Sequence, residues 1–148
     1  MRRVTLVRHA QAAGAAPSGR DFDRPLTEFG VTEARRTAAA LLAQQGVPDL
    51  LVTSPAVRTV QTATLLQELA FPDIPLVVEP ALYLASADAL LEYLRSLDDD
   101  RAHVLVLCHN PGISDCCTRL AADGRETVLG TAAWRHFGRA VDRWVDLR

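Results

Sequence analysis

Short apolar runs alternate along the chain with longer stretches in which apolar residues recur at helical spacing. Four of the short runs predict strands, at residues 4–7, 50–53, 76–78 and 103–108. The last of these runs reads HVLVLC, and a continuous apolar run of this length is typical of a central strand that is buried on both faces. We therefore expect a sheet in which residues 103–108 lie near the middle.

Helices are expected between these strands, because each longer stretch opens with a capping residue or a proline. The expected helices are residues 27–45 with Thr27 as N-cap, residues 54–69 with Ser54 as N-cap and Pro55 at the first helical position, a helix from Ser86 or Asp88 through Leu97, and residues 111–120. Gly46 supplies the stop signal after Gln45. Residues 131–137 and 142–147 predict two further strands, which we expect to be antiparallel.

Strands that alternate with helices predict an α/β fold. We expect a three-layer α/β/α sandwich with a mostly parallel central sheet and an antiparallel edge formed by the C-terminal strands. The length of 148 residues is typical of one domain, which we place at residues 1–148.

The charged residues limit the reactions and phosphate-binding modes that are open to this chain. All 16 basic side chains are arginine, and with 18 acidic side chains the formal net charge is −2. A chain without lysine has no Schiff-base lysine and no P-loop lysine, so arginine, histidine or backbone N–H groups must hold any phosphate. The near-neutral balance argues against nucleic acid or a membrane surface as a partner.

Cysteine usage and the N-terminus favour a cytoplasmic protein. The three cysteines, Cys108, Cys116 and Cys117, do not form the even-numbered framework of a secreted domain. Arg8 interrupts the first apolar run before it reaches the length of a signal peptide, and no run reaches the 18 or more apolar residues of a membrane span.

Polar side chains follow three of the predicted strands at their carboxyl ends. His9 follows Arg8 at the end of the first strand, Arg58 lies one turn into the helix after the second, and His109 follows residues 103–108. The carboxyl ends of parallel strands meet at one edge of a sheet, which is where such folds bind ligands. Two guanidinium groups and an imidazolium match a phosphoryl dianion, and two histidines allow one to be a neutral nucleophile while the other is a protonated oxygen ligand.

A zinc site formed by His9, His109 and Cys108 is the alternative at this edge. It lacks further ligands at a recognisable spacing, so we expect no metal and no other cofactor.

Four segments resemble, in order, the motifs of the histidine phosphatase superfamily, which is also called phosphoglycerate-mutase-like. They are LVRHA at residues 6–10, RPLTEFG at 24–30, SPAVRTVQTA at 54–63 and VLCHNP at 106–111. The resemblance extends from residue 4 to about residue 120. The short chain and the close spacing of the motifs are most similar to the SixA-type branch of phosphohistidine phosphatases.

The resemblance implies a function and assigns roles. His9 would be the nucleophile that becomes phosphohistidine, and Arg8, Arg58 and His109 would bind the phosphoryl oxygens and stabilise the group in transfer. Arg24 is a candidate for the rim of the substrate site. The implied activity is that of a metal-independent phosphatase, with phosphohistidine on a partner protein as the substrate and a monomer or weak dimer as the working form.

Two positions depart from the family pattern. Ala10 replaces the glycine of the first motif, which is tolerable if the backbone φ angle there is negative. Many superfamily members place an acidic general acid after the third strand, where this chain has Ala81, with Glu79 as a possible substitute. An alkoxide needs such an acid much more than an imidazole leaving group does, so we expect a preference for phosphohistidine.

Two alternatives remain open. One is a small-molecule phosphomonoesterase that acts on a phosphorylated metabolite with Glu79 as the acid. The other is a non-catalytic phosphate-binding or interaction module.

Overall fold

The computed structural model describes residues 1–44 and 46–148. In chain order its strands and helices are β1 (Arg2–Arg8), α1 (Glu28–Gln44), β2 (Leu50–Thr53), α2 (Val57–Ala70), β3 (Leu76–Val78), α3 (Ala87–Arg95), β4 (His103–Cys108), α4 (Gly112–Leu120) and β5 (Trp134–Arg139). The predicted strands at 50–53, 76–78 and 103–108 are confirmed with these bounds. Gln45, the expected last residue of the first helix, lies outside the described residues.

The five strands form one sheet in the order β3-β2-β4-β1-β5. The strands β1, β2, β3 and β4 are parallel, and β5 pairs with β1 in the antiparallel direction. β4 therefore lies in the centre, between β1 and β2. The carboxyl ends of β1, β2 and β4 meet at one edge, as the sequence predicts.

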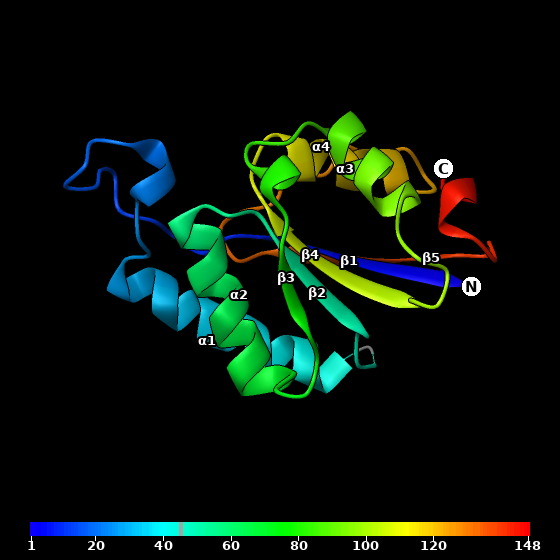
Figure 1. Cartoon of the computed structure of the whole chain (residues 1–148), viewed down its shortest axis with the longest axis horizontal. Coiled ribbons are helices and arrows are strands. Elements are labelled where there is room, and N and C mark those ends of the chain that lie inside the picture. Colours follow the sequence, from blue (N-terminus) through cyan, green and yellow to red (C-terminus); the bar gives the residue numbers. More distant parts are fainter. Residues whose placement is uncertain (45) are drawn as a thin grey trace.

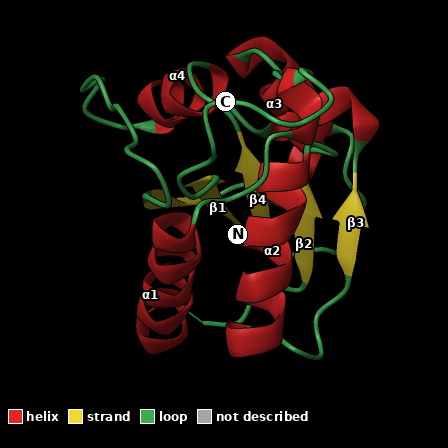
Figure 2. Cartoon of the chain, turned by 90° about the vertical axis from the view of Figure 1, so that its left-hand side faces the viewer, coloured by secondary structure: helices red, strands yellow, loops and turns green. Residues whose placement is uncertain are grey.

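Both faces of the sheet are covered by helices, which confirms the α/β/α sandwich (Figure 1). Val104, Val106 and Cys108 of β4 belong to a core cluster with α3 and α4, whereas Leu105 and Leu107 face a second cluster with α1 and α2. This alternation explains why the whole of β4 is apolar. Figure 2 shows α1 and α2 side by side on one face of the sheet.

The C-terminal segment corrects one prediction. The expected strand at 142–147 is a short 3-10 helix, Trp144–Asp146, after β5. Trp144 is fully buried in the core on the α3 and α4 side, and its indole N–H donates a hydrogen bond of 2.7 Å to the carbonyl of Arg101. Anchoring one large side chain there favours a tight turn over a further extended strand.

Helix starts show which capping residues act. The Ser86 side chain accepts a hydrogen bond of 3.2 Å from the Ala89 N–H, so Ser86 and not Asp88 caps α3. The helix ends at Arg95, before the expected Leu97.

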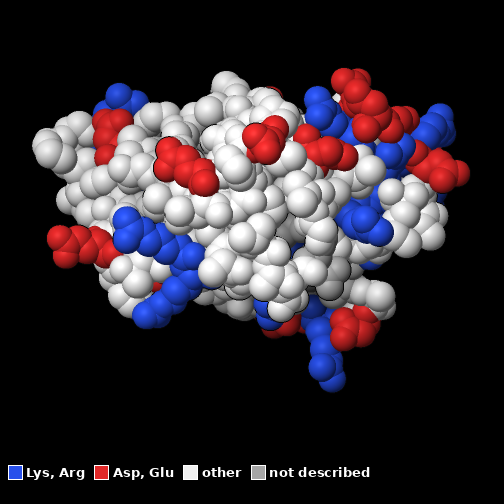
Figure 3. All heavy atoms as spheres, turned by 90° about the horizontal axis from the view of Figure 1, so that it is seen from below, with Lys and Arg blue, Asp and Glu red and all other residues white. Residues whose placement is uncertain are grey.

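None of the helices among residues 1–44 and 46–148 is long and apolar enough to cross a membrane. Viewed from below, acidic and basic side chains are scattered around a broad uncharged area (Figure 3).

Candidate active site

A small cavity of about 300 Å³ lies at the carboxyl ends of β1 and β4. It is lined by Arg8, His9, Gln11, Ala12, Asp21, Arg24, Arg58, Leu84, His109, Asn110 and Thr131. The structure thus brings together all four residues that the strand ends predict, and it adds Arg24 from the loop between β1 and α1.

His9 is held as a neutral imidazole with one free nitrogen. Its Nδ1 lies 2.7 Å from the carbonyl oxygen of Ala10, so Nδ1 carries the proton and donates it to that bond. Burial lowers the pKa of His9 from 6.5 to about 4, and the positive charges of neighbouring arginines act in the same direction. At neutral pH the Nε2 atom therefore carries a lone pair.

His109 faces His9, with 5.5 Å between the ring centroids. Its Nδ1 lies 3.2 Å from Nη2 of Arg58, and its Nε2 lies 2.7 Å from the hydroxyl oxygen of Ser54. A guanidinium can only donate, so Nδ1 accepts and Nε2 donates to Ser54. Burial, followed by the charge of Arg58, lowers the pKa of His109 to about 3.

The two histidines are therefore both neutral at neutral pH. This differs from the expected division into a neutral nucleophile and a protonated ligand. The main cause is burial, which disfavours a charged ring, and the positive charge of neighbouring arginines adds to it. A bound dianion would raise the pKa of His109 again.

Ser54 corrects a second prediction. Helix α2 begins at Val57 with Ala56 as its N-cap residue and without a side-chain cap. The Ser54 hydroxyl instead orients His109, and its oxygen lies at the long distance of 3.4 Å from the Ala56 N–H. A residue expected to cap a helix thus fixes the orientation of a candidate catalytic ring.

Arg8 and Arg58 each have an Nε–H that is buried without a hydrogen-bond partner among the described residues. Arg58 is only 2% exposed. Its Nη atoms donate hydrogen bonds to the backbone carbonyl of Asp21 at 2.9 Å and to the Asp21 carboxylate at 3.0 Å. An unpaired buried donor on a charged group is costly, and both of these arginines line the cavity, where their charge favours an oxyanion.

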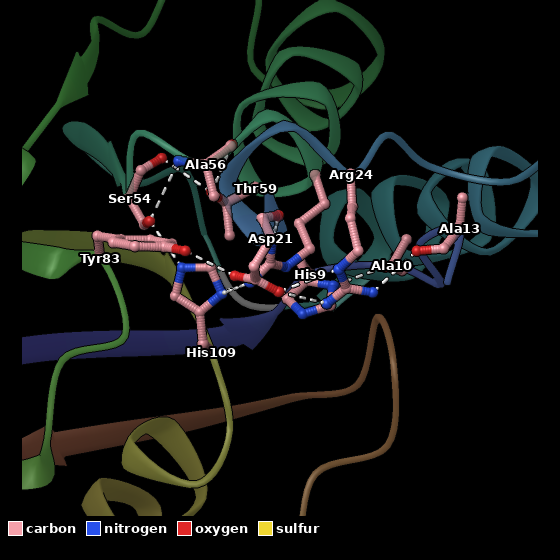
Figure 4. A network of polar contacts seen from close by, with 11 residues as sticks. His9, Ala10, Ala13, Asp21, Arg24, Ser54, Ala56, Thr59, Tyr83 and His109 are labelled. Atoms are coloured by element: carbon pink, nitrogen blue, oxygen red, sulfur yellow. Dashed lines mark hydrogen bonds and ion pairs between the residues drawn. The ribbon is translucent and has the colours of Figure 1, made fainter. Parts of the chain in front are cut away.

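Asp21 is a residue that the sequence reasoning missed. Its carboxylate accepts hydrogen bonds from Tyr83 at 2.6 Å, from Arg24 at 3.0 Å and from Arg58 at 3.0 Å (Figure 4). The Tyr83 bond is the main cause that lowers the pKa of Asp21 to about 2, and the two arginines add to it. Asp21 therefore stays ionised and ties the loop after β1 to the arginines.

The alanine in the first motif is accommodated as expected. Ala10 is fully buried, and its N–H donates to the Thr62 hydroxyl at 3.1 Å. Among the described residues other than glycine, only Leu84 and Ala132 have a positive φ angle. Ala10 thus has an ordinary backbone conformation, in which a methyl group costs little.

Two candidate side chains lie away from the cavity. The chain turns at Pro80 into a short 3-10 helix, and the Glu79 carboxylate accepts a hydrogen bond of 3.2 Å from the Ala81 N–H. Glu79 is not among the lining residues. The thiol of Cys108 donates to the carbonyl of Leu82 at 3.1 Å, on the face covered by α3 and α4, so it is not aimed at the two histidines.

Comparison with known proteins identifies the class. The model of the histidine phosphatase superfamily (branch 1) matches residues 4–83, and the chain belongs to this superfamily. An Agrobacterium tumefaciens protein assigned as the phosphohistidine phosphatase SixA is 31% identical with a TM-score of 0.82, covering 91% of this chain and 90% of its own. The protein histidine phosphatase SixA in complex with tungstate is 28% identical with a TM-score of 0.80, covering 90% and 86%.

These structures place the chain in the SixA-type branch, as a phosphatase. An uncharacterized chloroplastic protein of Arabidopsis thaliana is 29% identical over 149 residues, which cover 94% of this chain and 68% of that protein.

Proposed function

We propose that this phosphatase acts through a phosphohistidine at His9 and that its substrate is phosphohistidine on a partner protein. The observation that carries the proposal is the state of His9: a neutral ring whose Nε2 is free, beside two arginines with unpaired Nε–H groups. A nucleophile and donors for the transferring oxygens are the parts that phosphoryl transfer requires.

In the first step Nε2 of His9 attacks phosphorus as the bond from phosphorus to the substrate nitrogen breaks. The electron pair of that bond goes to the leaving ring, whose second nitrogen takes a proton from solvent, so the product is neutral histidine. Arg8 and Arg58 hold the phosphoryl oxygens. The charge of the dianion raises the pKa of His109, whose Nδ1 can then take a proton from solvent in place of the hydrogen bond from Arg58 and donate it to a phosphoryl oxygen.

In the second step water attacks the phosphorus on His9, phosphate is released, and the electron pair returns to Nε2. The Nδ1–H of His9 stays bonded to the Ala10 carbonyl throughout. His9 therefore leaves as a neutral imidazole, and this step needs no separate general acid.

The acidic side chains in and near the cavity support phosphohistidine as the substrate class. An alkyl phosphate must protonate its leaving oxygen, yet Asp21, the carboxylate that lines the cavity, is ionised with a pKa of about 2. Glu79, the acid that a small-molecule phosphomonoesterase would need, is bonded to the backbone outside the cavity. An imidazole leaving group, whose conjugate acid has a pKa of about 6.5, takes its proton from solvent and departs without such a donor.

A substrate panel tests this proposal. Phosphohistidine, phosphoramidate, p-nitrophenyl phosphate and a sugar phosphate are compared by kcat/KM on the wild-type protein and on His9→Ala. We expect the two phosphoramidates to exceed the sugar phosphate by about 100-fold or more, which is the usual size of a general-acid contribution. Equal values for phosphohistidine and the sugar phosphate would contradict the assignment.

A further inference from the structure

One large apolar residue lies among the charged and polar groups of the cavity. Leu84, from the segment after β3, is one of the lining residues, and Ala12 is the only other apolar residue among those described there. Leu84 is 55% exposed, so it contributes little to the core. An exposed leucine on an open surface is ordinary, but this one lies where a substrate enters a cationic site.

The backbone of Leu84 is strained. Its φ angle is +50°, in the left-handed region that leucine rarely adopts. Ala132 also has a positive φ angle, but two hydrogen bonds account for it: its N–H donates to the His9 carbonyl at 3.1 Å, and its carbonyl accepts from Thr37 at 2.7 Å. Within the described part of the chain, the backbone of Leu84 has no such bond. Strain that local hydrogen bonds do not explain indicates a functional constraint.

The residues on either side hold Leu84 in this conformation. The ring of Tyr83 lies edge-on to the ring of His109, with 5.7 Å between their centroids. Ala85 is buried, and its carbonyl oxygen lies so close to Gly112 that a Cβ atom on this glycine would overlap with it. Leu84 is therefore fixed between one neighbour that packs in the site and another that packs against the start of α4.

The cavity is larger than the group that is transferred in it. A water molecule takes up about 30 Å³ of the liquid, so a phosphoryl group with four non-hydrogen atoms fills on the order of 100 Å³. The cavity has about 300 Å³, which leaves room for part of the leaving group. The arginines and histidines are the groups that bind the phosphoryl oxygens, whereas Leu84 offers nothing to an anion. Leu84 therefore suits the leaving group.

The shape of the leaving group decides whether an apolar neighbour is favourable. An imidazole has its nitrogens on the edge of a flat ring, so leucine can pack on the face of the ring without leaving a polar group unpaired. A sugar has hydroxyl groups all around its ring, and an apolar wall leaves some of them without a partner. On the basis of the proposed function, we propose that Leu84 packs against the imidazole ring of the phosphohistidine substrate and is a specificity-determining residue of this phosphatase.

Two substrates with the same phosphorus–nitrogen bond test this assignment. Free phosphohistidine carries the ring, and phosphoramidate has none. The variants are Leu84→Gly, which suits a positive φ angle, and Leu84→Ala, which removes the side chain but keeps the strain. Leu69→Ala is the matched control, because Leu69 is 50% exposed and lies near the end of α2, outside the lining of the cavity.

Both Leu84 variants should raise the KM for phosphohistidine about tenfold, which is a usual effect of losing an apolar contact with a substrate. They should keep kcat/KM for phosphoramidate within about twofold. The thermal midpoint of Leu84→Gly should be no lower than that of the wild type, because glycine relieves the strain. Leu69→Ala should leave the kinetics of both substrates unchanged.

Equal losses of kcat/KM on the two substrates would overturn the assignment, because they would show that Leu84 only shapes the site. An unchanged KM for phosphohistidine in both Leu84 variants would overturn it as well. The proposed function fails in a different way, through a wild type that does not hydrolyse phosphohistidine or a His9→Ala variant that still does, so the two failures are distinguishable.

Discussion

β4 has one histidine at its first residue and another just after its last. Each is paired with a second histidine, which lies at the end of β1 in one case and on β5, beyond β1, in the other. His109 faces His9 at the carboxyl end of the sheet, and His103 faces His136 with 5.1 Å between ring centroids. In the second pair, Nε2 of His103 and Nδ1 of His136 both lie 2.9 Å from the Thr5 hydroxyl. His9, His103 and His109 are buried and His136 is half-buried. All four pKa values are lowered, mainly by burial.

The difference between the pairs lies in what their nitrogens contact. The Thr5 hydroxyl contacts one nitrogen of each ring in the second pair, and neither ring lines the cavity. His9 instead keeps Nε2 free, and the arginines around it have unpaired donors. A lowered pKa alone therefore does not mark an active site, whereas a free lone pair beside unsatisfied cations does.

Substituting one histidine of each pair should give the largest difference in kcat between the two pairs. His9→Ala removes the proposed nucleophile and should lower kcat by at least about 10³-fold. His103→Gln, its control in the other pair, should keep kcat within a few-fold while lowering the thermal midpoint. Steady-state kinetics with phosphoramidate and thermal unfolding measure both effects, and a similar loss of kcat in the two variants would contradict the distinction.

A second comparison uses two arginines that each have a buried, unpaired Nε–H. Arg58→Ala should lower kcat about 10²- to 10³-fold, because it removes a cation from the lining of the cavity in which charge develops. Arg2, at the other end of β1, has the same unpaired group. Arg2→Ala should reduce stability without changing kcat, and a large kcat effect there would argue against the assigned clamp.

Substitution of Asp21 should have a smaller effect on kcat, because Asp21 acts by positioning Arg58. Asp21→Asn keeps the shape of the side chain and the backbone carbonyl bond to Arg58, but it removes the carboxylate charge that holds the Arg58 guanidinium, so kcat should fall about tenfold. The affinity for inorganic phosphate should not weaken, since a negative charge beside the anion is lost. Phosphate inhibition constants and kcat separate these effects, and a weaker phosphate affinity at constant kcat would contradict the positioning role.

The smallest effect is on the pH dependence of stability. The folded pKa of His103 is about 4 and its ordinary value is 6.5, so between these values the unfolded chain binds more protons than the folded chain. The free energy of unfolding should therefore fall as the pH is lowered from 6.5 toward 4. His103→Gln should make that slope shallower in urea unfolding, and an unchanged slope would contradict this account.

The convergence of His9, Arg58 and His109 could be predicted from the sequence because parallel strands fix the edge at which their ends meet. The order of strands and helices along the chain can be read from the apolar periodicity. The same pattern identifies residues 103–108 as a buried central strand of the sheet. These features depend on local pattern and on a general rule of sheet topology.

Asp21, Ser54 and Trp144 show what could not be predicted. Asp21 acts through the path of a loop, which no periodicity encodes. The local signal of Ser54 as a helix cap is overridden by its buried contact with His109. The extended pattern around Trp144 is overridden by the burial of its indole ring. In each case a tertiary contact outweighs a local preference.

Trapping of the phosphoenzyme tests the central claim most directly. The protein is mixed with phosphohistidine, quenched in alkali within milliseconds, and digested for mass spectrometry under conditions that preserve phosphoramidates. The account predicts phosphate on His9, acid-labile and absent from His9→Ala. Turnover of the substrate with phosphate on another residue, or with none on His9 at any time, would contradict it.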